Sequence, residues 1–161
     1  MLEERIVNIL AGVAVFQGLT RDDLKSLANK SRKLTFQERD ILIQEGKEES
    51  ALYILIKGKL KVFLPQEMKG KKEQRVTEVS LNFLKEGDCF GEYSLIDHKP
   101  VSASVIAAES GELIQIQGTD FHEIVDKDDR IARIVYENIL RILVKRLRKK
   151  DQELDLMLVI G

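Results

Sequence analysis

The sequence predicts a mainly β fold: a jelly-roll β-roll flanked by α-helices, with a long helix at the C-terminal end. Short β-rich segments separated by glycines fill the middle of the chain. Segments with apolar residues at helical spacing precede these β-rich segments, and a longer segment of the same kind follows them. Many short strands joined by glycine turns are typical of sandwiches and jelly rolls rather than of parallel sheets. We therefore expect one domain over residues 1–161, with a helical lead-in (1–33), a β-roll (34–117) and C-terminal helices (118–161).

Two helices are expected in the lead-in. Residues 2–10 place apolar side chains at helical spacing, which predicts a short amphipathic helix. Further on, Thr20 is followed three residues later by Asp23, and Leu24 and Leu27 then share one helical face. Thr20 is therefore the expected N-cap of a second helix.

The β-roll is expected to contain short strands between glycine turns. The predicted strands cover residues 41–43, 52–56, 60–64, 76–81, 101–106 and 113–116. Between two of them, residues 66–74 carry three lysines and a single apolar residue, Met68. This composition predicts a solvated hairpin loop.

Helical patterning returns after the roll. Thr119 is the expected cap of a short helix that continues through Phe121 and Val125. Asp128 and Asp129 then open a long helix that reaches about Met157, because acidic residues favour a helix N-terminus.

Composition and charge exclude several functional classes. With 26 basic and 27 acidic residues, the formal net charge of −1 gives no indication of a nucleic-acid partner or an anionic membrane. Cys89 is the only cysteine, so no intramolecular disulfide can form. The apolar run at 6–16 follows net acidic residues and is too short to span a bilayer, so we expect a cytoplasmic protein without a membrane segment.

The segment 87–105 carries the strongest functional motif: it reads Gly-Asp-Cys-Phe-Gly-Glu-Tyr-Ser-Leu-Ile-Asp-His-Lys-Pro-Val-Ser-Ala-Ser-Val. It resembles the phosphate-binding cassette of the cyclic-nucleotide-binding domain family, whose pattern runs Phe-Gly-Glu, a small residue and Leu, and closes with Pro-Arg-Ala-Ala-Thr-Val. The Phe-x-Gly-Leu-Thr run at Phe16, the turn glycines and the final helix also match. The resemblance is to the sensor domains of catabolite activator and cyclic AMP receptor proteins in particular, and it covers the chain from about Val13 onward. It implies a cyclic-nucleotide-binding-domain-like β-roll.

The resemblance also implies which residues bind a ligand. They are Phe90, Gly91, Glu92, Tyr93, Ser94, Leu95, Val101, Ser102 and Ala103. In the family the glycine lets the backbone approach the ligand and the glutamate accepts a hydrogen bond from the ribose. Val101 stands where the family has the arginine that pairs with the cyclic phosphate, so the cassette is degenerate.

Loss of that arginine predicts weak binding of cyclic AMP or cyclic GMP. A guanidinium is planar, always charged and able to bind two phosphate oxygens together, whereas an isopropyl group supplies no counter-charge. Two nearby cations, Lys99 and Arg75, are candidates to replace it. A different small ligand that suits Val101 remains an alternative, and no cofactor is expected to be required.

No catalytic or metal site is expected. The chain has two histidines, His98 and His122, in separate predicted elements, and it has no nucleophile–base motif or Walker-type loop. The C-terminal helix carries Asp151, Glu153 and Asp155 after a basic run of Arg141, Lys145, Arg146, Arg148, Lys149 and Lys150. This mixture favours a solvated helical surface over a nucleic-acid interface, and we expect no DNA-binding domain after it.

The long C-terminal helix carries two apolar stripes, which call for two packing surfaces. The isoleucine-rich stripe comprises Ile131, Val135, Ile139 and Ile142, and the leucine-rich seam comprises Leu140, Leu143, Leu147, Leu154 and Met157, broken by Lys150. We expect the first stripe to pack on the roll and the second to pair two chains.

Two functional hypotheses follow. The chain is either a non-enzymatic sensor domain that binds a small ligand, or a ligand-independent module that binds itself or a downstream protein partner of unknown identity.

Overall fold

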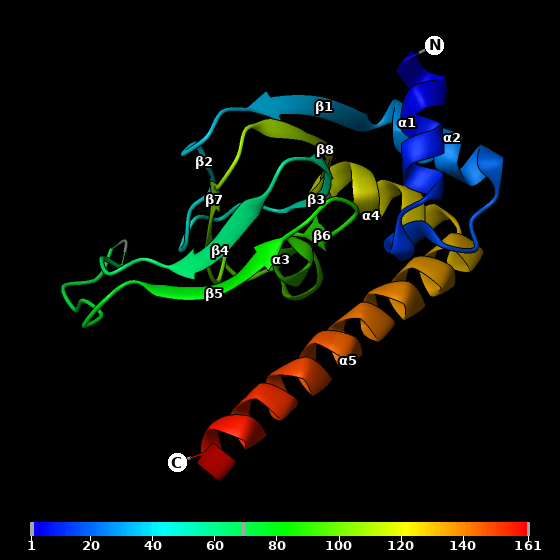
Figure 1. The fold of residues 1–161 in the computed structure, drawn as a ribbon. Helices are drawn as coiled ribbons and strands as arrows, with labels where there is room; N and C mark the ends of the chain where they lie inside the picture. The colour runs from blue at the N-terminus through cyan, green and yellow to red at the C-terminus, as the bar shows by residue number, and fades with distance from the viewer. Residues whose placement is uncertain (1, 69, 161) are drawn as a thin grey trace.

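The computed structural model describes residues 2–68 and 70–160 (Figure 1). Two α-helices and a short 3-10 helix come first: α1 (Leu2–Ala11), η1 (Ala14–Phe16) and α2 (Arg21–Asn29). The strands follow, with α3 (Glu92–Asp97) inserted among them, and α4 (Gly118–Lys127) and α5 (Asp129–Ile160) end the chain. The predicted mainly β fold with flanking helices and a long C-terminal helix is confirmed.

The strands form two four-stranded antiparallel sheets. The first has the order β1-β8-β3-β6 and the second β2-β7-β4-β5. Their bounds are β1 (Ser31–Phe36), β2 (Ile41–Ile43), β3 (Ala51–Lys57), β4 (Leu60–Leu64), β5 (Val79–Leu84), β6 (Cys89–Phe90), β7 (Ser104–Ala107) and β8 (Gly111–Gln117).

Several strand boundaries differ from the sequence prediction. Regular β structure already begins at Ser31, because β1 pairs along its length with β8. The strand expected at 76–81 begins only at Val79, and Val76 is 98% exposed. The strand expected at 101–106 begins at Ser104, because Val101 pairs through its backbone with the turn at residues 46–47 instead.

Strand β3 separates two hydrophobic cores, which explains why its first five residues are all buried. Leu52 and Ile54 point toward the helices, where they join the core formed with α1, α2, α4 and α5. Tyr53 and Leu55 point the other way, into the core between the two sheets. Since side chains alternate across a strand, only a strand covered on both faces has this pattern.

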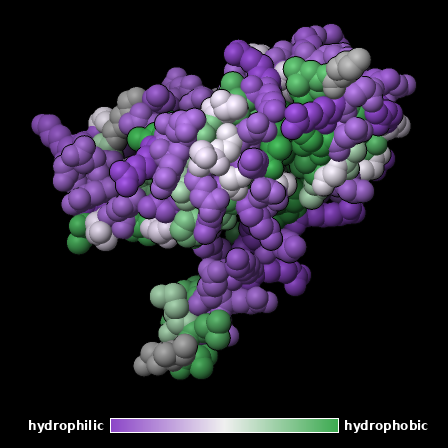
Figure 2. Space-filling view, turned by 45° about the horizontal axis from the view of Figure 1, so that its top comes forward, coloured by the Kyte–Doolittle hydropathy of each residue, from purple (hydrophilic) through white to green (hydrophobic). Residues whose placement is uncertain are grey.

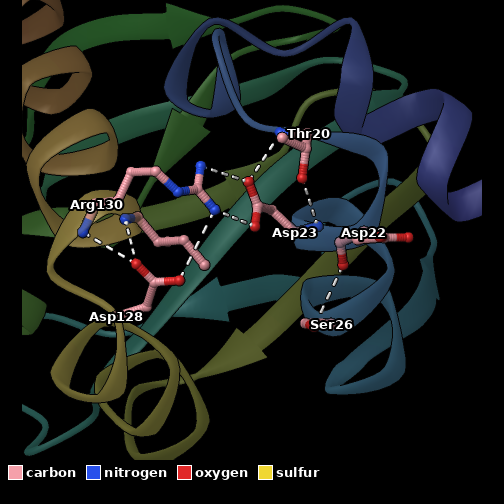
Figure 3. Close-up of polar contacts among 7 residues, drawn as sticks. Thr20, Asp22, Asp23, Ser26, Asp128 and Arg130 are labelled. Atoms are coloured by element: carbon pink, nitrogen blue, oxygen red, sulfur yellow. Dashed lines mark hydrogen bonds and ion pairs between the residues drawn. The ribbon is translucent and has the colours of Figure 1, made fainter.

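A polar network fastens the lead-in to the C-terminal helices (Figure 3). Thr20 caps α2 as predicted: its side chain accepts a hydrogen bond from the Asp23 amide, and the Asp23 carboxylate accepts one from the Thr20 amide. The same carboxylate accepts two hydrogen bonds from the Arg130 guanidinium, at 2.7 and 3.0 Å. The hydrogen bond from Arg130 lowers the pKa of Asp23 more than burial raises it. The pKa of Asp23 therefore lies below its ordinary value of 3.8.

The C-terminal helices begin slightly differently from the prediction. Helix α4 starts at Gly118 with Gln117 as its N-cap, so Thr119 lies inside the helix and does not cap it. At the start of α5, the Asp128 side chain accepts hydrogen bonds from the amides of Arg130 and Ile131, so Asp128 supplies the expected acidic cap.

Helix α5 changes its environment along its 32 residues. Its first part packs in the helical core through Ile131, Val135 and Ile139, mainly against η1 and α4, whereas the sequence analysis expected this stripe to pack on the roll. Its last part extends beyond the roll to the C-terminal tip of the molecule (Figure 1). Figure 2 shows apolar side chains at this projecting end, below a polar middle section.

Candidate functional site

The candidate site is built on the turn between β6 and α3. Gly91 has φ +87°, in the left-handed region, and it is the N-cap of α3. A Cβ at this position would lie 2.3 Å from the Ala51 carbonyl oxygen and 3.0 Å from a ring carbon of Tyr53. Both the conformation and the close contact therefore require glycine.

The residues around Gly91 divide into buried and accessible side chains. Phe90 is buried and stacks on Tyr53 with 5.0 Å between ring centroids. Leu95 is fully buried in the helical core, and Ser94 is also buried. Tyr93, by contrast, is 54% exposed on the outer side of α3. Only part of the predicted site can therefore meet a ligand through side chains.

Glu92 is buried and bound by a residue that the sequence analysis had placed on a solvated surface. The Arg146 guanidinium of α5 forms an ion pair with the Glu92 carboxylate, and it donates a second hydrogen bond, of 2.8 Å, to the Cys89 carbonyl oxygen. Burial acts to lower the pKa of Arg146, but opposing effects led by the Glu92 carboxylate outweigh burial, so the pKa of Arg146 is raised overall. Glu92 is thus a paired carboxylate in this state of the molecule.

Helical spacing could have shown that Arg146 faces the roll, although not that it binds Glu92. It lies on the same side of α5 as Ile139 and Ile142, three to four residues further along at each step. The stripe that faces the roll simply changes from apolar to cationic where α5 crosses the cassette. One turn later, the Lys150 amine donates a 3.2 Å hydrogen bond to the Leu81 carbonyl oxygen of β5.

Val101 lies half-buried and packs against the core between the two sheets. Its amide donates to the Lys47 carbonyl oxygen at 3.0 Å, and its own carbonyl accepts from the Gly46 amide at 2.8 Å. Ser102 beside it is exposed, and Ala103 is half-buried. Val101, Ser102 and Ala103 therefore lie in the loop that follows α3, and none of the three side chains is a cation.

The two cations considered as replacements have different surroundings. Arg75 is held by Glu45 through two hydrogen bonds of 2.6 and 2.9 Å, and it also donates to the Pro65 carbonyl oxygen. Lys99 lines a polar hollow of about 280 Å³ beside α3, where Ser94 and two carboxylates, Glu48 and Glu49, also contribute. Arg75 is therefore committed elsewhere, and Lys99 shares its hollow with two negative charges.

A larger cavity, of about 540 Å³, lies away from these residues. It lies beside the second sheet, where Ile41, Phe63 and Ser104 line it together with residues of the 65–74 hairpin. None of the nine predicted site residues lines it. Size alone therefore does not locate the site, and we place it at the cassette because the backbone geometry there is specific.

Cys89 and the histidines provide no reactive group in the described part of the chain. Burial, followed by the negative charge of Glu92, raises the pKa of the Cys89 thiol to about 12, so the thiol stays protonated near neutral pH. His122 contacts the Leu95 carbonyl oxygen through Nε2 at 3.0 Å, and its ring lies 5.4 Å from that of His98. Among residues 2–68 and 70–160, no group of three or more potential ligands is arranged to hold a metal ion.

Helix length and hydropathy give no candidate for membrane crossing in the described part of the chain.

Comparison with known proteins places this geometry in context. A family model described as "Cyclic nucleotide-binding domain" matches residues 33–128. The cyclic AMP receptor protein of Thermus thermophilus is 32% identical over 149 residues, which cover 92% of this chain and 63% of that protein. Human cGMP-dependent protein kinase 2 is 32% identical over 108 residues, or 67% of this chain and 13% of the kinase.

Solved structures agree with the sequence matches. The crystal structure of Thermus thermophilus catabolite activator protein aligns with a TM-score of 0.69 at 28% identity, covering 89% of this chain and 62% of that one. A cyclic nucleotide-binding domain from Methylobacillus flagellatus aligns with a TM-score of 0.76 at 18% identity, over 94% and 81% of the two chains, which supports the fold alone. The chain thus spans less than two thirds of the length of the bacterial receptor proteins that it matches.

Proposed function

The chain belongs to the cyclic nucleotide-binding domain family, and we propose that it is a non-enzymatic regulatory domain that binds cyclic AMP or cyclic GMP only weakly. Cytoplasmic location, self-association and a downstream protein partner are parts of the same proposal. The observation that carries it is Val101 in the loop after α3, which packs on apolar neighbours at the position where the family has an arginine.

The charge balance around the cassette supports weak binding. A cyclic phosphate placed here would meet Val101 rather than a guanidinium, and it would have Glu48 and Glu49 near Lys99. Loss of a hydrogen bond to a charged group costs about 1.5–3 kcal/mol. At about 1.4 kcal/mol per tenfold change, affinity falls roughly 10- to 150-fold. Desolvation of the phosphate without a counter-charge adds to this loss.

Titration calorimetry with cyclic AMP and cyclic GMP tests the proposal. For the unmodified protein we expect no saturable binding at low micromolar ligand. Val101→Arg should improve affinity by at least about tenfold, because it restores a two-oxygen contact with the phosphate. Val101→Met is the matched control, since it adds length without charge and should leave affinity unchanged.

Two outcomes would contradict the proposal. A submicromolar dissociation constant for the unmodified protein would show that the missing arginine does not limit binding. Unchanged affinity in a folded Val101→Arg protein would show that the rest of the pocket has been lost.

The second candidate function is a ligand-independent module for self-association or protein interaction, and one observation favours it. Beyond its contacts with the roll, α5 exposes large apolar side chains, with Leu140 61%, Leu147 64% and Leu154 57% accessible. Exposed leucines that recur at helical spacing mark an interaction face. We propose that this face pairs two copies of the chain. Sedimentation analysis at high micromolar protein tests the idea, and a strictly monomeric protein would refute it.

A further inference from the structure

The larger cavity, beside the second sheet, is separate from the cassette residues, and we call it the hairpin cavity. It measures about 540 Å³, within the range of about 300–1,000 Å³ that is typical of small-molecule sites. Its lining comes from β2 and the turn that follows it, from β4, from β7 and from the 65–74 hairpin. The cavity is therefore bounded by the hairpin and by three strands of one sheet.

Hydrogen bonds fasten the hairpin to the sheet beside this cavity. The Arg75 guanidinium donates to both carboxylate oxygens of Glu45, at 2.6 and 2.9 Å, and to the Pro65 carbonyl oxygen at 2.7 Å. The Glu45 amide in turn donates to the Ser104 hydroxyl oxygen of β7 at 2.9 Å. A two-oxygen contact between a guanidinium and a carboxylate has a fixed geometry. The cavity is therefore preformed, and a ligand would not have to order the hairpin on binding.

Part of the lining is apolar. Phe63 of β4 is buried, Met68 of the hairpin is half-buried, and Ile41 of β2 remains 62% exposed. A large exposed aliphatic side chain in a cavity favours a ligand that covers it. Aromatic rings pack well against phenylalanine and also against the polarizable sulfur of methionine. These three side chains together favour a ligand with an aromatic body.

The charges around the cavity balance. Two carboxylates, of Glu45 and Glu67, and one amine, of Lys71, belong to the lining, and Arg75 pairs with Glu45. The hydrogen bonds from Arg75 lower the pKa of Glu45 more than burial raises it, so this pair stays ionised near neutral pH. Two positive groups therefore match two negative ones. A charged ligand would lose hydration without gaining an unpaired counter-charge, which is unfavourable.

Two glutamine amides supply further polar groups that a ligand can use. Gln44 lies in the turn after β2 and Gln74 lies in the hairpin, and both side chains are exposed. An amide both donates and accepts hydrogen bonds, so it pairs well with another amide. We propose that the hairpin cavity binds an uncharged amphipathic molecule, with its aromatic body against the apolar lining and an amide-like group bonded to Gln44 and Gln74. This site is independent of ligand binding at the cassette.

Three small probes of similar size test the charge preference. Benzamide, benzoate and benzylammonium each carry one aromatic ring and differ in charge, so they separate ring binding from electrostatics. In an NMR titration of backbone amides, benzamide should shift the residues that line the cavity. Its dissociation constant should be at least about tenfold lower than that of either charged probe. Equal or tighter binding of a charged probe, or the absence of saturable benzamide shifts at the cavity, would overturn the proposal.

Gln74 and Gln66 form a matched pair of test positions. Both are exposed and lie in the hairpin, but only Gln74 lines the cavity. Gln74→Ala should raise the dissociation constant of benzamide roughly two- to tenfold, because one hydrogen bond is lost. Gln66→Ala should leave it unchanged. Equal effects of the two substitutions would contradict a contact between the ligand and the Gln74 amide.

Filling the cavity gives a second test that does not depend on hydrogen bonds. Ile41→Trp places a large ring at an exposed position of the lining and should abolish benzamide binding. Leu34→Trp adds the same ring at an exposed position of β1, in the other sheet, and should leave binding unchanged. The NMR spectrum of each variant reports whether its fold is kept. Unchanged benzamide binding by a folded Ile41→Trp protein would refute the proposal.

Discussion

Gly91 decides the shape of the cassette through both its backbone and its missing side chain. Its φ of +87° costs a non-glycine residue about 1–2 kcal/mol, and the added Cβ would also press into the Ala51 carbonyl oxygen at 2.3 Å. Gly87, four residues earlier, has a similar φ of +92° but nothing within 4 Å of an added Cβ. The two glycines therefore separate backbone strain from steric clash.

Gly91→Ala and Gly87→Ala are expected to differ in stability. Gly87→Ala should lower the free energy of unfolding by about 1–2 kcal/mol, from strain alone. Gly91→Ala should lower it further, because the clash with β3 is added. Urea denaturation measures both, and equal losses would show that β3 yields to the added methyl group without cost.

Asp23 gives a prediction of pH dependence. Because Arg130 holds its pKa below 3.8 in the folded protein, ionised Asp23 stabilises the fold at neutral pH. This contribution is complete above the unfolded-state pKa and is lost as the pH falls through the lower, folded-state pKa. Asp23→Asn should therefore be destabilised most at about pH 7, with the difference shrinking toward about pH 2. Denaturation at a series of pH values measures this, and a pH-independent difference would contradict it.

At the scale of elements, α5 organises the molecule because successive turns of it bind different parts. Near its start Arg130 holds α2, and in its middle Asn138 holds the segment around η1. Further along, Arg146 binds the cassette and Lys150 the β5 edge. A movement of α5 would therefore change contacts in the lead-in and at the candidate site at the same time.

Asn138 connects α5 to the segment around η1. Its buried amide donates to the Val15 and Gln17 carbonyl oxygens, at 3.1 and 2.8 Å. Asn138→Ala should lower the free energy of unfolding by about 1–3 kcal/mol, because buried polar groups lose their partners. Amide hydrogen exchange should quicken in residues 13–19. Exposed Gln152→Ala, on the same helix, is the control and should change neither quantity.

At the scale of the whole molecule, self-association makes stability depend on concentration. If folded chains pair through α5, mass action favours the folded state as protein concentration rises. The thermal midpoint of the unmodified protein should therefore increase between low and high micromolar concentration, while that of Leu147→Glu should stay constant. Differential scanning fluorimetry at several concentrations measures this, and parallel behaviour of the two proteins would count against pairing.

The sequence by itself determined those features that depend on neighbouring residues. The capping box of Thr20 and Asp23, the helix of residues 2–10 and most strands are set by propensity and periodicity within a few positions. The cassette could also be located, because its glycine and flanking residues occur in one short run. The predicted ligand-binding roles of those residues remain predictions.

Only the tertiary structure decided which distant side chains meet. Arg146 and Glu92 are 54 positions apart and Arg75 and Glu45 are 30 apart, so no local pattern pairs them. The free face of α5 was also decided by packing. Leu143 and Val144 are neighbours in the sequence and lie on adjacent faces of α5. Contact with the helical core partly covers Leu143 but leaves Val144 exposed. Local periodicity shows that a helix has apolar faces, and the neighbouring elements determine which of them remains uncovered.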